Sequence, residues 1–135
     1  MRGFEKFDIL TNRDERGWVS NLLDFMPIKP VDLKNVHIVS MEPGAVRGNH
    51  YHKRQVEALC VLGLKMRVKA VNRKTGESCE EVIGDRPPSM YVVQPEVSHA
   101  FRNESDQVSY LVCFTDTTYD FDNPDSFSDE VFEKE

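Results

Sequence analysis

The sequence predicts an all-β fold, a sandwich or a small barrel, and three observations support this prediction. Apolar stretches of about five to eight residues recur along the chain, and turn-forming residues bound each of them. Residues 65–72 largely alternate between apolar and polar side chains, which is the pattern of a strand buried on one face. No helix of three or more turns is indicated before residue 122. Many short strands in 135 residues favour a sandwich or barrel.

The expected strands are separated by clear turn signals. The stretch 18–25 follows the turn-like sequence NRDERG, and the stretch 35–41 ends before Pro43 and Gly44, a strong breaker pair. The segment 84–88 contains two prolines and is expected to be a loop, because proline donates no hydrogen bond to a sheet. The other expected strands are 56–62, 65–72, 79–83, 90–93, 99–102 and 108–115.

Residues 122–135 form an acidic tail with six carboxylates and one lysine. The sequence Asn-Pro-Asp at its start resembles a helix cap, so a short helix with Phe127, Val131 and Phe132 on one face is one expectation. A solvated, partly frayed end is the other.

Length and composition are those of an ordinary globular protein, and we expect one domain over residues 1–135. Apolar residues make up 39% and charged residues 30%, which favours neither disorder nor a membrane protein. The net charge of −6 argues against broad nucleic-acid binding but leaves room for a local basic pocket. The apolar runs are too short to cross a membrane, and the N-terminus lacks the apolar segment of a secretory signal. We therefore predict a cytoplasmic protein with no membrane partner.

The three cysteines, Cys60, Cys79 and Cys113, form an odd set without CxxC spacing. Cys60 and Cys113 lie inside apolar runs. We interpret them as small buried hydrophobic residues in a reducing compartment.

Residues 47–58, RGNHYHKRQVEA, contain the candidate site. On a strand, His50 and His52 point to the same face, and Glu57 can return from the next strand after a turn at 53–55. His99 offers a fourth donor. Imidazole and carboxylate groups suit Zn, Ni, Fe and Mn, so one divalent metal ion held by these four residues is one interpretation. A catalytic base beside a substrate clamp, or a polar turn without a function, are the alternatives.

The spacing of these residues resembles the cupin superfamily over residues 35–115, most of the chain. Gly44, His50, His52 and Glu57 match its first motif, and His99 followed three residues later by Asn103 matches the end of its second. The resemblance implies a cupin fold, a double-stranded β-helix or jelly-roll-like barrel, with a metal on the four donors. Gly63 comes one place earlier than is usual, and the stretch before His99 lacks the usual glycine.

A narrower resemblance concerns the nucleotide-sugar cupins. The stretch Arg47-Gly-Asn-His50 looks like the Arg-Gly-x-His motif of dTDP-4-dehydrorhamnose 3,5-epimerases, dTDP-sugar 3,4-ketoisomerases and the epimerase domain of capsular-polysaccharide enzymes. The turn at 14–17 and the segments 98–101 and 110–120 also resemble theirs, and the last is similar to the epimerase segment that carries a tyrosine acid.

This resemblance implies roles for individual residues. His50 would be the base, Tyr110 the acid, and Arg47 the partner of a diphosphate or enolate oxygen. Lys53, Tyr51 and Phe101 are expected substrate contacts. Metal ligation and base catalysis compete for His50. Because the rhamnose epimerases carry glutamine where this chain has His52, we favour ligation.

These observations favour a metal-binding isomerase or epimerase that removes a proton beside the keto group of a dTDP- or UDP-4-keto-6-deoxyhexose. An iron or nickel dioxygenase-type cupin, and a non-catalytic module that binds a sugar or another small molecule, are the alternatives. By analogy with other small cupins we expect a homodimer. His37 is interpreted as a strand residue with a structural hydrogen bond, or alternatively as a pocket residue.

Overall fold

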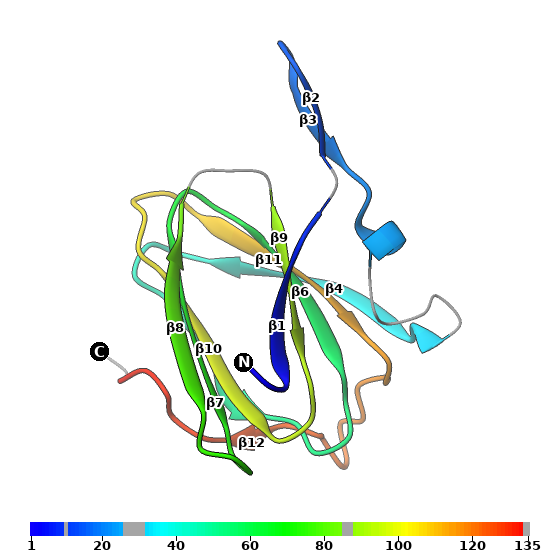
Figure 1. Ribbon diagram of the computed structural model, residues 1–135. Helices are drawn as coiled ribbons and strands as arrows, with labels where there is room; N and C mark the ends of the chain where they lie inside the picture. The colour runs from blue at the N-terminus through cyan, green and yellow to red at the C-terminus, as the bar shows by residue number, and fades with distance from the viewer. Residues whose placement is uncertain (10, 26–31, 85–87, 134–135) are drawn as a thin grey trace.

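Two five-stranded antiparallel sheets dominate the computed structural model, which describes residues 1–9, 11–25, 32–84 and 88–133 (Figure 1). The first sheet runs in the order β1 (Phe4–Asp8), β9 (Ser89–Val93), β6 (Glu57–Leu62), β11 (Ser109–Thr115) and β4 (Asn35–Met41). The second runs in the order β12 (Phe127–Ser128), β5 (Val46–Tyr51), β10 (Val97–Asn103), β7 (Met66–Asn72) and β8 (Ser78–Ile83). The predicted all-β class is confirmed.

A separate hairpin extends away from the two sheets in Figure 1. It consists of β2 (Thr11–Asp14) and β3 (Gly17–Ser20), and its turn is tied by an ion pair between Asp14 and Arg16. The single strand predicted over 18–25 is wrong in its second half, because a short 3-10 helix, Leu22–Phe25, follows β3. No helix in the described ranges is long and apolar enough to cross a bilayer.

The other predicted strands are present, with ends that shift by one or two residues. The half-buried pattern expected over 65–72 is observed in β7, where buried and partly buried residues alternate throughout. β1 was not predicted, although it pairs with β9 along its whole length. Most of the loop predicted at 84–88 lies outside the described residues.

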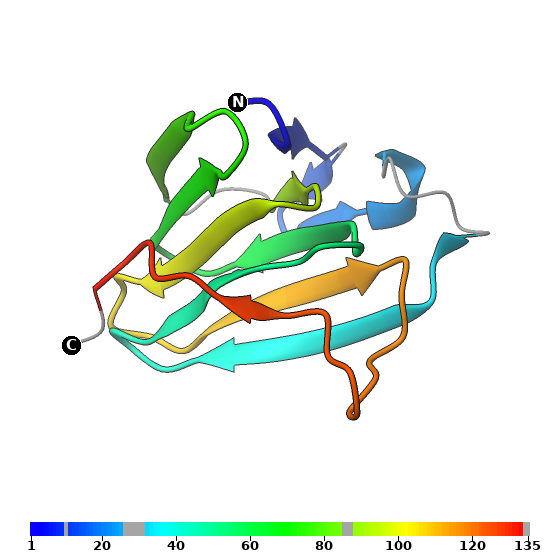
Figure 2. The ribbon, with the colours of Figure 1, turned by 90° about the horizontal axis from the view of Figure 1, so that it is seen from below.

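The C-terminal segment forms no helix between residues 122 and 133, so the short helix expected there is wrong. This segment runs along the edge of the second sheet, where β12 pairs with β5 (Figure 2). The side chain of Asn49 accepts hydrogen bonds from the backbone of Val131 and Phe132 and donates one to the carbonyl of Phe132. These contacts satisfy backbone groups that a helix would have paired internally, and they hold the segment up to residue 132 against the second sheet.

The main core fills the space between the two sheets, and a second apolar cluster covers the outer face of the first sheet. Strands β6 and β9 belong to both clusters and are therefore buried on both faces. Glu57 opens β6, so it is attached to one of the most firmly packed strands of the protein. Cys60 and Cys113 are buried as predicted, Cys79 is partly buried, and all three are free thiols.

Candidate functional site

A cavity of about 1180 Å³ is lined by residues of both sheets and of the C-terminal segment. Arg47, His50, His52, Glu57 and His99 all contribute to its wall. It is slightly larger than the usual range of small-molecule sites, about 300–1,000 Å³, so it has room for a ligand of considerable size.

A β-bulge explains the sequence Arg47-Gly-Asn-His50. Across the β5–β10 pair, His50 faces His99 and Gly48 faces Ala100, so Asn49 is an extra residue on β5. Asn49 and Gly48 have φ values of 54° and 102°. A Cβ atom on Gly48 would lie 2.6 Å from the backbone oxygen of His99, so only glycine fits here. Because the bulge resets the alternation of the strand, Arg47 and His50 both line the cavity although they are three residues apart.

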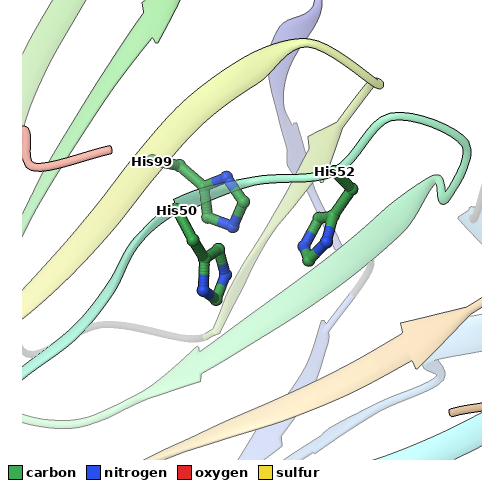
Figure 3. Close-up of side chains that lie close together, drawn as sticks. All are labelled: His50, His52 and His99. Carbon is green, nitrogen blue, oxygen red and sulfur yellow. The ribbon is translucent and has the colours of Figure 1, made fainter. Parts of the chain in front are cut away.

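Three imidazoles converge inside the cavity (Figure 3). His50 lies in β5, His52 is the first residue after the end of β5, and His99 projects from the neighbouring β10. The ring centroids are 4.9 Å apart for His50 and His52, 4.8 Å for His50 and His99, and 5.5 Å for His52 and His99. One nitrogen from each ring lies within 4.8 Å of the other two. His52 and His99 are almost fully buried, with 5% and 1% of their surface exposed.

Hydrogen bonds fix the orientation of two of these rings. Nδ1 of His99 donates to the carbonyl of Val97 at 3.0 Å, which leaves its Nε2 with a free lone pair. Nδ1 of His52 donates to the carbonyl of Asp125 at 2.5 Å, and its Nε2 lies 3.0 Å from a carboxylate oxygen of Glu57. The backbone carbonyls thus hold the histidines in the way that outer-shell groups usually hold metal-binding histidines.

Asp125 supports the site in a second way, which the sequence analysis missed. Its carboxylate accepts hydrogen bonds from the consecutive backbone amides of Lys53, Arg54 and Gln55, at 2.8 to 2.9 Å. These amides form the turn that separates His52 from Glu57. The Asn-Pro-Asp stretch did contain a capping signal, but the residues that Asp125 caps lie about 70 positions earlier in the chain.

The electrostatics of the cluster favour a neutral His50. Burial, together with the neighbouring His99 and His52, lowers the pKa of His50 to about 4. Burial also lowers the pKa of His99. Burial disfavours the charged forms of His52 and Glu57 as well, but their contact outweighs it, so the pKa of His52 is raised and that of Glu57 falls to about 2. Without a metal, the contact between them therefore favours the charged forms of both His52 and Glu57.

The structure separates the predicted substrate contacts into two groups. Arg47 lines the cavity, whereas Tyr51 and Lys53 lie outside it, where Tyr51 stacks on Phe127 and the ammonium of Lys53 lies over the same ring. Tyr51 points away because it lies between two inward-facing histidines on an extended chain. Phe101 borders the cavity but is 1% exposed, so it can offer a ligand only part of an apolar floor.

Tyr110, the predicted acid, also lies outside the cavity. On β11 the alternate residues Leu111 and Cys113 line the cavity, and Tyr110 is on the opposite, exposed face. The tyrosine of the same segment that does line the cavity is Tyr119, at its exposed rim. His37 lines the cavity too, and its Nδ1 lies 3.2 Å from the side-chain amide of Asn35, so the pocket interpretation of His37 and the hydrogen-bond interpretation both hold.

The donors present fit a divalent transition metal. The three imidazoles form one group, and the carboxylate of Glu57 contacts His52. Imidazole and carboxylate groups are ligands that Zn, Ni, Fe and Mn accept. His50, His52, Glu57 and His99 are the residues that would hold such an ion.

Comparison with known families adds to this geometry. The sequence model of the polysaccharide biosynthesis C-terminal domain family matches residues 12–127. This chain belongs to that family. Among curated proteins, none matches this chain in sequence.

Several solved structures are similar to this chain. The capsular polysaccharide assembling protein CapF from Staphylococcus aureus is 22% identical with a TM-score of 0.68, over 93% of this chain and 33% of CapF. QdtA, a sugar 3,4-ketoisomerase from Thermoanaerobacterium thermosaccharolyticum in complex with TDP, is 16% identical with a TM-score of 0.75, over 94% and 88% of the two chains.

NovW, a 4-keto-6-deoxy sugar epimerase from Streptomyces spheroides, is 17% identical with a TM-score of 0.74, over 90% of this chain and 67% of NovW. These similarities confirm the cupin fold. The chain spans only about a third of the length of CapF.

Proposed function

We propose that this protein is a metal-binding isomerase or epimerase for a nucleotide-linked 4-keto-6-deoxy sugar. The observation that carries the proposal is the convergence of Arg47 and His50 on one cavity, which depends on the bulge at Gly48 and Asn49. The similarity to a ketoisomerase that was solved with TDP and to a 4-keto-6-deoxy sugar epimerase supports the same substrate class.

The chemistry needs a proton acceptor, a proton donor and a clamp for the substrate. Protons on the carbons beside a keto group are acidic, and their removal requires a base that is neutral at working pH. His50 is neutral at working pH because its pKa is lowered to about 4, but the same shift makes it a weaker base than an ordinary histidine. The exposed guanidinium of Arg47 donates to the carbonyl of Ser40, at 3.3 Å, and its planar fork suits a diphosphate.

We assign the proton donor to Tyr119. Its phenol lies at the rim of the cavity in the segment 110–120, whose sequence resembles the tyrosine-bearing segment of the epimerases. The T-shaped contact of its ring with Phe121, at 4.6 Å between centroids, gives the exposed side chain one packing partner.

A metal ion would be held by His50, His52, Glu57 and His99. When bound, it would supply a Lewis acid that polarises the keto oxygen of the substrate. Ligation and base catalysis by His50 exclude one another, since the same buried ring would have to serve both. Protein that is active without metal would use His50 as the base, and protein that is active only with metal would use it as a ligand.

The test is deuterium incorporation from D₂O into TDP- and UDP-linked 4-keto-6-deoxyhexoses, followed by proton NMR. We expect loss of the signal of a proton beside the keto carbon with the wild-type protein, and no loss with His50→Ala. Parallel samples treated with a chelator or loaded with Zn²⁺ separate the two roles of His50. Binding of TDP without exchange in any sample would refute the enzyme and favour a binding module.

A further inference from the structure

The wall of the cavity opposite the three histidines carries a second set of metal-binding groups. His37 on β4, Glu57 on β6 and Cys113 on β11 each place one donor atom within 4.8 Å of the other two. The three strands are neighbours in the first sheet, and His37 and Cys113 face each other in the register of β4 and β11. The set is therefore built on paired backbone and not on a loop.

The environment of Cys113 differs from that of an ordinary core cysteine. Its side chain lines the cavity and contacts the carboxylate of Glu57, although only 1% of the residue is exposed. Cys60 is equally buried in the same sheet, but it lies in the apolar cluster on the outer face and does not line the cavity. Packing alone accounts for Cys60, whereas Cys113 lies among polar donors.

Glu57 connects this set with the three histidines. One of its oxygens accepts from His52 at 3.0 Å and from the side-chain amide of Gln55 at 3.3 Å. A carboxylate has two oxygens and about four lone pairs, so it can serve ions on both sides. Carboxylates of this kind occur between paired ions in two-metal sites, where the ions lie about 3.5–4 Å apart.

We propose that the cavity contains a second metal position, formed by His37, Glu57 and Cys113. A set of one thiolate, one imidazole and one carboxylate selects Zn²⁺ over Mg²⁺ or Ca²⁺. Three protein ligands leave the fourth tetrahedral position for water or a substrate oxygen. On binding, the sulfur–hydrogen bond of Cys113 breaks, its proton passes to solvent, and a sulfur–metal bond forms. His37 exchanges its exposed contact with Asn35 for the ion.

The test uses Co²⁺ added to metal-free protein, because thiolate coordination produces an intense sulfur-to-cobalt charge-transfer absorption in the near ultraviolet. We expect this absorption in the wild type and in the matched control Cys60→Ser. We expect it to disappear in Cys113→Ser and in His37→Ala, with one Co²⁺ fewer bound. His99→Ala, which alters only the first set, should keep it.

Absence of the charge-transfer absorption in the wild type would overturn the proposal, and so would its survival in Cys113→Ser. If Cys113→Ser does not fold, X-ray absorption at the zinc edge of the wild-type protein decides. A sulfur neighbour at about 2.3 Å supports the site, and a shell of only nitrogen and oxygen overturns it. None of these readings involves a sugar, so the second metal position and the proposed activity can fail independently.

Discussion

Replacement of Asp125 by alanine should weaken both the fold and the proposed metal site. The substitution removes the carboxylate that accepts three consecutive amides of the turn at 53–55. It also frees the backbone whose carbonyl holds Nδ1 of His52. The turn at 53–55 and the orientation of the His52 ring together place His52 in contact with Glu57. The single substitution of Asp125 therefore disturbs both the turn and the ring.

The magnitude follows from the exposure of the three amides. A hydrogen bond to a charged group contributes about 1.5–3 kcal/mol. The amides of Lys53 and Arg54 are exposed and can bond to water instead, whereas that of Gln55 is partly buried and Asp125 itself is 11% exposed. We therefore expect a loss of about 2–3 kcal/mol, equivalent to roughly 10 °C in Tm for a domain of this size. Loss of an outer-shell partner typically weakens metal binding about 10–100-fold.

Thermal unfolding followed by circular dichroism measures the first effect, and competition with a chromophoric Zn²⁺ chelator measures the second. Asp122→Ala is the matched control, because it removes the same charge from an exposed position of the same segment. Asp125→Asn retains one acceptor oxygen and should fall between the two. If Asp125→Ala has the Tm and the Zn²⁺ affinity of Asp122→Ala, the support of the site by Asp125 is wrong.

Further predictions concern the bulge, the histidine charge and the two tyrosines. Gly48→Ala should prevent stable folding, because the added Cβ would lie 2.6 Å from a backbone oxygen of β10. Gly76 has a similarly positive φ but lies in open space, so Gly76→Ala should lower the free energy of unfolding, measured in urea, by only about 1–2 kcal/mol. In the metal-free protein, the His50 ring should stay neutral in NMR titrations until about pH 4. The free energy of unfolding should decrease as the pH falls from 6.5 through about 4, because His50 binds a proton over that range in the unfolded chain but not in the folded protein. If the His50→Gln variant shows the same dependence of unfolding free energy on pH, this prediction is wrong. Tyr119→Phe should slow deuterium exchange into the sugar by about 10²–10⁴-fold, whereas Tyr110→Phe should leave the exchange rate unchanged. If Tyr110→Phe slows the exchange and Tyr119→Phe does not, Tyr110 is the acid.

The sequence predicted the strands well where burial is one-sided or where turns are marked by proline and glycine. β7 and β4 are examples, the first through its alternation and the second through the Pro43 and Gly44 that follow it. β1 escaped prediction because its charged residues interrupt the apolar ones, and its pairing with β9 outweighs its weak pattern.

The four donors were predicted from spacing, and the structure brings them together, but the partners that orient them were not predictable. The carbonyl that holds His52 belongs to a residue 73 positions away, and a backbone carbonyl has no sequence signature. The position of Tyr110 outside the cavity was not predictable for a different reason. Which tyrosine faces the cavity depends on which alternate residues of β11 point inward and on where the strand ends. The sequence of this segment determines neither.

The contacts of Asn49 and Asp125 have a consequence for the order in which the protein is made. His50, His52, Glu57 and His99 are all synthesised before residue 100. The segment that pairs with β5 and caps the turn at 53–55 is synthesised only from residue 125 onward. A chain that ends at residue 121 holds all four donors but leaves Nδ1 of His52 and three turn amides to water. The final geometry of the proposed metal site is therefore reached only when the segment up to residue 132 has emerged and docked.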